Sequence, residues 1–137
     1  IDRYVIVDLS AALRTRQAET LRAHADKVTW ADRLPEALEA VVVGNEVLDA
    51  MPVALLHFDG TRWFERGVAV DDGRFVFADR PTALRPPLAG QAVPGTTTEL
   101  QRQAEAFVRT LAGVLKCGAA FFFDYGFPEH EYHHPQR

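Results

Sequence analysis

The segment with the clearest chemical content is 45–52, which reads NEVLDAMP. It places the amide of Asn45 and the carboxylates of Glu46 and Asp49 directly after an apolar run, 40–43. A short helical turn would bring Glu46 and Asp49 onto one face, because residues three apart are neighbours on a helix. Paired acids can hold a guanidinium through directional hydrogen bonds, or accept a proton. Simple capping of a short helix would use the same residues, so both interpretations stay open.

Asp8 is a second candidate, because it ends another apolar run, 4–7. An acid at the carboxyl end of a strand can accept two hydrogen bonds from the ribose diol of a nucleoside-type cofactor. The same acid can instead stabilise the start of the following helix through the helix dipole, with Ser10 as the N-cap. The spacing favours neither interpretation, since the glycine-rich turn that usually accompanies a ribose acid is absent from the sequence.

A third cluster, Asp124 and Tyr125, follows the apolar run 119–123. An acid and an aromatic side chain there could line the same cleft as the other strand-end residues, or belong to an ordinary turn. Further along, several side chains are of types that bind metals, but their spacing matches no known ligand pattern, and we predict no metal site. These side chains are Glu129, His130, Glu131, His133 and His134.

Apolar runs rich in β-branched residues predict strands that are buried on both faces, as in a parallel sheet. These runs cover 4–7, 40–43 and 119–123, and a shorter strand is predicted over 28–30. Helix-forming segments separate the strands, and this alternation indicates an α/β fold with a mainly parallel sheet. Ligands bind at the carboxyl ends of the strands in such sheets. Those ends carry the candidates above and Trp30.

Two helices are predicted, over 11–25 and 97–116. The second rests on a capping box formed by Thr96 and Glu99, and on Gly118 as a typical helix stop. The single cysteine, Cys117, comes just after this helix, and we predict that it is buried and unreactive.

Residues 53–95 have a different character, typical of an inserted antiparallel meander. The Asp-Gly pairs at 59–60 and 72–73 predict tight hairpin turns, which require positive φ. We expect the aromatic residues beside these turns to form the core of the meander. These are Trp63, Phe64, Phe75 and Phe77. The segment 80–95 is rich in proline, which predicts an irregular loop.

Composition narrows the classes of function. The 137 residues are 47% hydrophobic and 25% charged, with a formal net charge of -4, which is ordinary for a globular protein. No basic face stands out, so we predict no nucleic-acid partner. One cysteine excludes an internal disulfide and fits a reducing compartment. No apolar run approaches the roughly 20 residues that span a bilayer, so we predict no membrane insertion.

The motifs resemble the MidA-type family of class I S-adenosylmethionine-dependent protein methyltransferases, in order and over nearly the whole chain. The matching segments are 4–10, 28–30, 34–35, 44–53, 124–126, 131–132 and 135–137. Single matching residues are Leu13, Arg14, Gln17, Trp63, Glu65 and Val68. The segments 44–53 and 124–126 are the most specific of these.

The resemblance implies a Rossmann-like domain that uses S-adenosylmethionine. The predicted cofactor-binding residues are Asp8, Leu9, Ser10, Trp30 and Asn45, with Asp8 on the ribose hydroxyls and Leu9 near the adenosine. The predicted catalytic residues are Glu46, Asp49 and Asn45, and we hypothesise that the two acids orient an arginine guanidinium. The predicted substrate-binding residues are Asp124 and Tyr125.

The resemblance also implies a protein substrate. Mitochondrial members of the family are similar to an assembly factor that methylates an arginine on a core subunit of respiratory complex I. It further implies a cytoplasmic location in bacteria or the mitochondrial matrix in eukaryotes, and allows for a homodimer. Two alternatives remain. The same fold could act as a non-catalytic assembly or chaperone module, and Asp8 alone also fits a nicotinamide-dependent Rossmann enzyme.

The chain departs from the family pattern at both ends. The family's first strand and glycine-rich cofactor loop would precede Ile1, and its final strands would follow Arg137. The predicted domain, 1–137, is therefore a partial methyltransferase sheet that includes the insertion at 53–95. We expect this chain by itself neither to fold stably nor to bind the cofactor.

Overall fold

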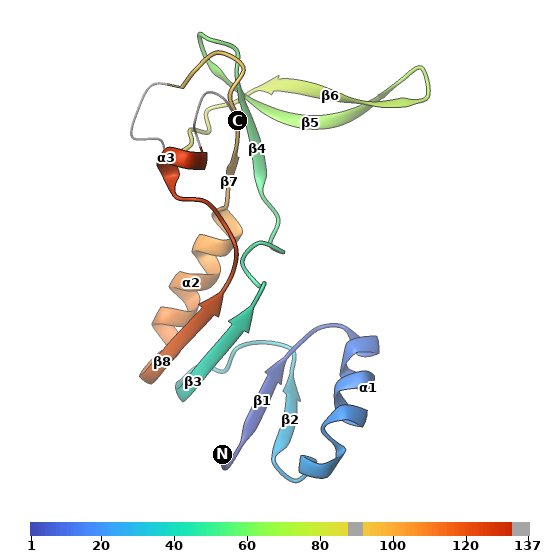
Figure 1. Ribbon diagram of the computed structural model, residues 1–137, viewed down its shortest axis with the longest axis vertical. Helices are drawn as coiled ribbons and strands as arrows, with labels where there is room; N and C mark the ends of the chain where they lie inside the picture. Colours follow the sequence, from blue (N-terminus) through green and yellow to red (C-terminus); the bar gives the residue numbers. More distant parts are fainter. Residues whose placement is uncertain (88–91, 133–137) are drawn as a thin grey trace. The chain divides into compact units, whose positions relative to one another are not determined.

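The computed structural model describes residues 1–87 and 92–132. The chain divides into two compact units. Unit 1 comprises Ile1–Ala40 and Leu111–Ala119, and unit 2 comprises Val41–Thr110 and Ala120–Arg137. The chain contains both strands and helices (Figure 1), in agreement with the predicted α/β class.

Unit 1 opens with a parallel strand pair. β1 (Tyr4–Val7) and β2 (Val28–Ala31) pair in register from Tyr4 opposite Val28 to Val7 opposite Ala31. Parallel neighbours need a crossover connection, and here it is the helix α1 (Ala11–Thr20) followed by the 3-10 turn η1 (Arg22–His24). Both predicted strands are confirmed, but Tyr4 and Val7 are exposed, so the prediction that 4–7 is buried on both faces is wrong. The predicted helix over 11–25 is confirmed only as far as Thr20, since its last part is η1.

The start of α1 agrees with the sequence. Ser10 is the N-cap, and its hydroxyl oxygen accepts a hydrogen bond from the backbone N–H of Leu13 at 3.3 Å. This contact satisfies one of the free N–H groups of the first turn. α1 therefore begins immediately after the end of β1, which brings its first two turns close to Asp8.

A second strand pair consists of β3 (Leu38–Asn45) and β8 (Leu115–Phe123). The backbone N–H of Glu46 donates to the carbonyl of Phe123, and Gly118 lies against the backbone of Ala40. Ala40 lies beside Gly118 and Glu46 beside Phe123, so the residue numbers increase in the same direction along both strands. The strands are therefore parallel, as their arrows in Figure 1 also show. This confirms the predicted strands at 40–43 and 119–123.

The prediction that these strands are buried on both faces is wrong. Val41 and Val43 are 68% and 67% exposed, and Phe121 and Phe123 are also exposed. The opposite face packs against the helix α2 (Arg102–Val114), where Phe107 meets Phe122 edge to face with ring centroids 5.9 Å apart. The contact with α2 thus involves only the face that carries Phe122.

The helix predicted over 97–116 is also partly wrong. Thr97–Leu100 is a strand, β7, and α2 does not begin until Arg102. β7 pairs antiparallel with β4 (Ala54–Phe58), and its β-branched threonines suit an extended backbone. Pairing with a distant strand therefore outweighs the local capping-box pattern.

Gly118 and Cys117 are likewise corrected. Gly118 is not a helix stop, since it lies inside β8 with φ 128°. A Cβ at this position would collide with the carbonyl of Ala40, so the glycine permits a close approach of two backbones. Cys117 is exposed rather than buried, because it belongs to this strand and not to a packed helix end.

The meander is a four-stranded antiparallel sheet with the order β6-β5-β4-β7. β5 covers Trp63–Asp71 and β6 covers Arg74–Pro81. The hairpin turn between them has positive φ at Asp72 (44°) and Gly73 (72°), as the Asp-Gly pair predicts. The loop predicted over 80–95 begins slightly later, because β6 continues to Pro81. Residues 88–91 lie outside the described part of the chain.

Asp59 organises the other predicted turn, between β4 and β5. One carboxylate oxygen, Oδ1, accepts from the backbone N–H groups of Thr61 (2.7 Å) and Arg62 (2.8 Å) and from the Thr61 hydroxyl (2.7 Å). The hydrogen bond from the Arg62 backbone is the main cause that lowers the pKa of Asp59 to about 2. The carboxylate thus replaces a backbone acceptor in the turn.

Part of the predicted meander core is wrong. Trp63 and Phe64 are partly buried, and the Trp63 ring lies 5.1 Å from that of Phe58. Phe75 and Phe77, however, are 83% and 68% exposed. They lie on the half of the β5–β6 hairpin beyond Arg66, where β5 no longer has β4 as a neighbour. Figure 1 shows this half as an extended arm.

Candidate functional site

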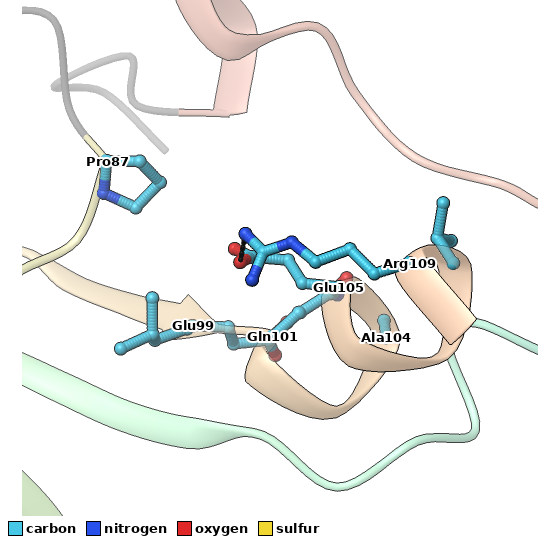
Figure 2. Close-up of a pocket in the computed structure, with 8 residues that line it drawn as sticks. Pro87, Glu99, Gln101, Ala104, Glu105 and Arg109 are labelled. Atoms are coloured by element: carbon cyan, nitrogen blue, oxygen red, sulfur yellow. Dashed lines mark hydrogen bonds and ion pairs between the residues drawn. The ribbon is translucent and has the colours of Figure 1, made fainter. Parts of the chain in front are cut away.

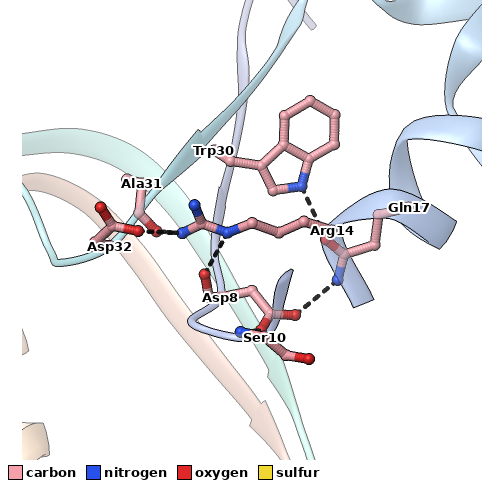
Figure 3. A network of polar contacts seen from close by, with 7 residues as sticks. All are labelled: Asp8, Ser10, Arg14, Gln17, Trp30, Ala31 and Asp32. Atoms are coloured by element: carbon pink, nitrogen blue, oxygen red, sulfur yellow. Dashed lines mark hydrogen bonds and ion pairs between the residues drawn. The ribbon is translucent and has the colours of Figure 1, made fainter. Parts of the chain in front are cut away.

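The first candidate site lies at the carboxyl end of β1 and is centred on Asp8 (Figure 3). Its Oδ1 accepts a hydrogen bond from the backbone N–H of Ser10 at 2.8 Å. Its Oδ2 accepts a hydrogen bond from the side-chain amide of Gln17 at 2.8 Å. The carboxylate is therefore fixed on two sides, once by the start of α1 and once by a residue two turns along the helix.

Gln17 links Asp8 to Trp30. Its amide oxygen, Oε1, accepts a hydrogen bond from the indole N–H of Trp30 at 2.8 Å. Trp30 lies on β2 and is half-buried, as are Gln17 and Asp8. The side chain of Gln17 therefore links the predicted residues Asp8 and Trp30, while Ser10 joins them through its backbone N–H bond to Asp8.

Arg14 fixes the ends of β1 and β2 to each other. Its Nε donates to the backbone carbonyl of Asp8 at 2.6 Å, and its Nη2 donates to the carbonyl of Ala31 at 2.9 Å. The same Nη2 lies 2.6 Å from a carboxylate oxygen of Asp32. A planar guanidinium can make these contacts at once because its donors have a fixed fork geometry.

These contacts also affect the ionisation of Asp8. The backbone N–H of Ser10, followed by the amide of Gln17, holds the pKa of Asp8 below its ordinary value. Asp8 is therefore a carboxylate at neutral pH. The neighbouring residue Leu9 is 81% exposed, so its side chain is accessible to a ligand beside the carboxylate.

The second candidate site lies in unit 2, where β3 and β8 end. Asp124 holds the turn that follows β3, since its Oδ2 accepts from the backbone N–H groups of Leu48 (3.1 Å) and Asp49 (3.2 Å). Its Oδ1 accepts from the backbone N–H of Tyr125 at 3.0 Å. Both oxygens of Asp124 thus accept hydrogen bonds from the backbone, so this acid holds the turn after β3 and the start of the segment after β8 in place.

Tyr125 and Asp49 form the exposed part of this second site. The Tyr125 hydroxyl hydrogen-bonds to the Asp49 carboxylate, and this bond is the main cause that raises the pKa of Tyr125. The charges of Asp49, Glu46 and Asp124 raise it further. The structure therefore brings together four predicted residues, Glu46, Asp49, Asp124 and Tyr125, in a cluster of negative charge.

The turn after β3 is not helical, which corrects the short helical turn expected to place Glu46 and Asp49 on one face. The backbone N–H of Met51 donates to the carbonyl of Leu48 at 3.2 Å, which closes a single turn. Glu46 has φ 48°, a left-handed conformation that is uncommon for residues other than glycine. Glu46 and Asp49 are thus near each other through this turn and not through a helix face. Asn45 is exposed at the end of β3.

Two important residues were not given a role from the sequence. Arg14 and Gln17 are three apart on α1 and therefore lie on the same side of the helix, which is the only local signal of their function. Their partners on β2 are distant in sequence, and only the fold reveals them. The two sites themselves lie in different units, with the Asp8 group in unit 1 and the Glu46 group in unit 2.

An open pocket of about 550 Å³ is found elsewhere in unit 2 (Figure 2). It lies along α2 and β7, and its lining includes Pro87, Glu99 and Gln101. Glu105 and Arg109 also line it and form an ion pair at 3.3 Å. None of the predicted site residues lines this pocket, so its size does not make it the candidate site.

Neither metal binding nor membrane crossing is indicated in the described part of the chain. No group of three or more metal-binding side chains is found among the residues that the structure describes. Of the candidates at the end of the chain, His133 and His134 lie outside those residues, as do 135–137 of the family signature. None of the described helices, which include the short α3 (Glu129–Tyr132), is long and apolar enough to span a membrane.

Comparison with known proteins gives a consistent assignment. The family described as "Putative S-adenosyl-L-methionine-dependent methyltransferase" matches residues 2–137. Two crystal structures from Burkholderia thailandensis match 100% of the chain with 57% identity and TM-scores of 0.89 and 0.88. One is an uncharacterised protein of the COG1565 superfamily, and the other is a superfamily member bound to S-adenosyl-homocysteine.

The chain covers only 39% and 38% of those two proteins, so it spans about two-fifths of their length. No curated protein matches it. The family match, by contrast, extends from Asp2 to Arg137 and includes every candidate residue in both units. The chain therefore belongs to this methyltransferase family.

Proposed function

We propose that this chain provides the ribose-binding and substrate-facing parts of an S-adenosylmethionine-dependent methyltransferase that modifies arginine in a protein. The observation that carries the proposal is 57% identity over the whole chain to a protein that binds S-adenosyl-homocysteine. When bound, S-adenosylmethionine supplies an electrophilic methyl group. The residues of this chain bind, orient and align, since methyl transfer depends on alignment more than on a covalent intermediate.

The donor set around Asp8 fits such a cofactor. A carboxylate has about four acceptor positions, two on each oxygen. One position on Oδ1 is taken by Ser10 and one on Oδ2 by Gln17. Each oxygen therefore keeps an acceptor position, and together they can receive the two hydroxyls of a ribose. Leu9 offers an exposed apolar side chain next to this carboxylate for the adenosine.

The second site fits a cationic side chain. Oδ2 of Asp124 already accepts two backbone N–H groups and Oδ1 a third, so this carboxylate cannot offer both oxygens to a ligand, and we assign the guanidinium to Glu46 and Asp49. A guanidinium has five N–H donors and matches paired carboxylates better than an ammonium does. Tyr125 supports the assignment, since its hydroxyl holds the Asp49 carboxylate. The family resemblance makes a core subunit of respiratory complex I the first protein to test.

Titration calorimetry of the complete gene product with adenosylhomocysteine tests the cofactor half of the proposal. Asp8→Asn should weaken binding at least about tenfold, because it removes charge-assisted hydrogen bonds to the ribose. Asp26→Asn is the matched control, since Asp26 is an exposed acid of the same unit. Equal affinities for wild type and Asp8→Asn would contradict the role of Asp8.

Transfer of a labelled methyl group to the complex I subunit tests the substrate half. We expect the label on an arginine, and Glu46→Gln or Asp49→Asn should reduce its incorporation at least about tenfold, because each removes one charged acceptor of the guanidinium. Asp71→Asn, on the exposed part of β5, is the control. Label on another residue type would refute arginine modification. A subunit that binds without any label would favour the assembly-module alternative.

A further inference from the structure

The amide of Gln17 has two different partners, and their chemistry fixes its orientation. The indole N–H of Trp30 is only a donor, and the carboxylate of Asp8 is only an acceptor. A side chain between them must accept from one and donate to the other, as Gln17 does at 2.8 Å on both sides. Among side chains of this length, glutamate lacks the donor and lysine lacks the acceptor. Position 17 thus requires an amide.

We propose that Gln17 is a positioning residue of the cofactor site, which sets the angle of the Asp8 carboxylate relative to the ribose and ties that carboxylate to Trp30. This inference rests on the proposed function, because it assumes that Asp8 receives the ribose hydroxyls. The inference goes beyond the proposed function because it assigns the specificity for a ribose diol to Gln17, a residue that the ligand does not touch.

The geometry explains why the angle matters. The backbone N–H of Ser10 fixes Oδ1, but a single hydrogen bond leaves the carboxylate free to rotate about its bond to the chain. The bond from Gln17 to Oδ2 removes that freedom. Gln17 is in turn fixed by Trp30 on β2, so the angle depends on the hydrogen bond that links α1 to β2. A diol needs both free acceptor positions at once, whereas a single hydroxyl does not.

Gln17 also affects the pKa of the Asp8 carboxylate. The Gln17 amide contributes to the lowered pKa of Asp8, after the larger effect of Ser10. Loss of the amide would therefore raise the pKa of Asp8, and protonation would begin at a higher pH. Since protonation removes the charge and turns one acceptor position into a donor, the loss of cofactor binding on acidification should also begin at a higher pH.

The test uses the complete gene product and two ligands, adenosylhomocysteine and its 2′-deoxyribose analogue. Wild type should prefer the ribose ligand by about tenfold or more, the value of hydrogen bonds to a charged acceptor. In Gln17→Leu the new side chain has nearly the same size but no polar atoms. This variant should lose most of the preference, because its affinity for the ribose ligand should fall while its affinity for the deoxyribose ligand stays the same. Its binding of the ribose ligand should also fail at a higher pH than that of wild type.

Two further variants separate the causes. Gln17→Glu can still accept from Trp30 but repels Asp8, so it should lose the preference as Gln17→Leu does. Thr15→Ala is the control on the same helix, because its hydroxyl contacts only the Ala11 carbonyl, and it should leave the preference unchanged. A general structural defect would instead lower the affinities for both ligands by the same factor, so the ratio of the two affinities would not change.

The outcomes distinguish this inference from the proposed function. If Asp8→Asn weakens binding while Gln17→Leu keeps the wild-type preference for ribose, Gln17 is not a positioning residue and the proposed function stands. If Gln17→Leu weakens both ligands equally, the inference fails in the same way. If wild type binds neither ligand, or Asp8→Asn has no effect, the proposed function is overturned and the inference with it.

Discussion

From the sequence, helix stabilisation and ligand binding are alternative roles for Asp8. The structure shows that one carboxylate has room for both. Its Oδ1 anchors the start of α1 through Ser10, which is the helix-stabilising role. The anchoring uses only part of its capacity to accept hydrogen bonds. The proposed ligand-binding role would therefore need no change in the helix, and the two interpretations are compatible for the same carboxylate.

The second site offers a prediction for a single residue, Tyr125. Asp49→Asn should lower the pKa of Tyr125 toward the ordinary tyrosine value, because the hydrogen bond to Asp49 is the main cause of its elevation. Glu46→Gln should lower the pKa by less, since Glu46 acts only through its charge and ranks after Asp49. Carbon-13 NMR of labelled tyrosines would follow the titration, with Tyr4 in unit 1 as a spectroscopic control. An unchanged titration in Asp49→Asn would contradict the hydrogen bond.

The sequence predicted the positions of some candidate residues in the fold but not the contacts of others. Asp8, Glu46 and Asp124 could be predicted because an acid after an apolar run marks the end of a strand. Gln17 could not be assigned a role, because its partner Trp30 is 13 positions away on another element. The turn of Glu46 was also missed, since its left-handed backbone depends on the bond from its N–H to Phe123 on β8.

At the level of elements, local patterns failed where pairing with a distant strand competed with them. The hairpin turns at 59–60 and 72–73 were predicted correctly, because the preference of Asp-Gly pairs for a tight turn is local and needs no distant contact. The capping-box pattern of Thr96 and Glu99 was misleading, because β7 pairs with β4, about 40 residues earlier in the chain. Helix propensity is a weak preference that such contacts override.

The close approach of β3 and β8 leads to a prediction about Gly118. Gly118→Ala should destabilise the complete gene product by about 2 kcal/mol or more, because the new methyl group meets the Ala40 carbonyl at a positive φ. Gly113→Ala is the matched control. Gly113 lies in α2 with open space around it, so alanine there should be neutral or stabilise by up to about 1 kcal/mol. Urea unfolding would measure both changes, and equal midpoints for the two variants would contradict the close approach.

For the whole molecule, the small number of buried apolar side chains is the main feature. Among the described residues, those buried are Val28, Leu56, Ala104 and Leu111. The two parallel strand pairs are also separate sheets of two strands each. Two-stranded sheets are at best marginal, and burial of apolar area is the dominant favourable contribution to folding.

We therefore expect the isolated 137-residue chain to unfold over a broad range of temperature without a sharp heat-capacity peak. Scanning calorimetry would measure this, with the longer Burkholderia thailandensis relative as the control for cooperative unfolding. A single sharp transition of the isolated chain, with equal calorimetric and van't Hoff enthalpies, would contradict the expectation.

The left-handed backbone of Glu46 has a consequence for protein engineering. A residue with a side chain is held there at a cost of about 1–2 kcal/mol, which glycine would not incur. A library screened only for resistance to heat should therefore enrich glycine at position 46, and with it lose the carboxylate. If Glu46 has the proposed role, a screen that also demands methyl transfer should keep glutamate, and the difference between the two selected pools would measure the stability lost to that role.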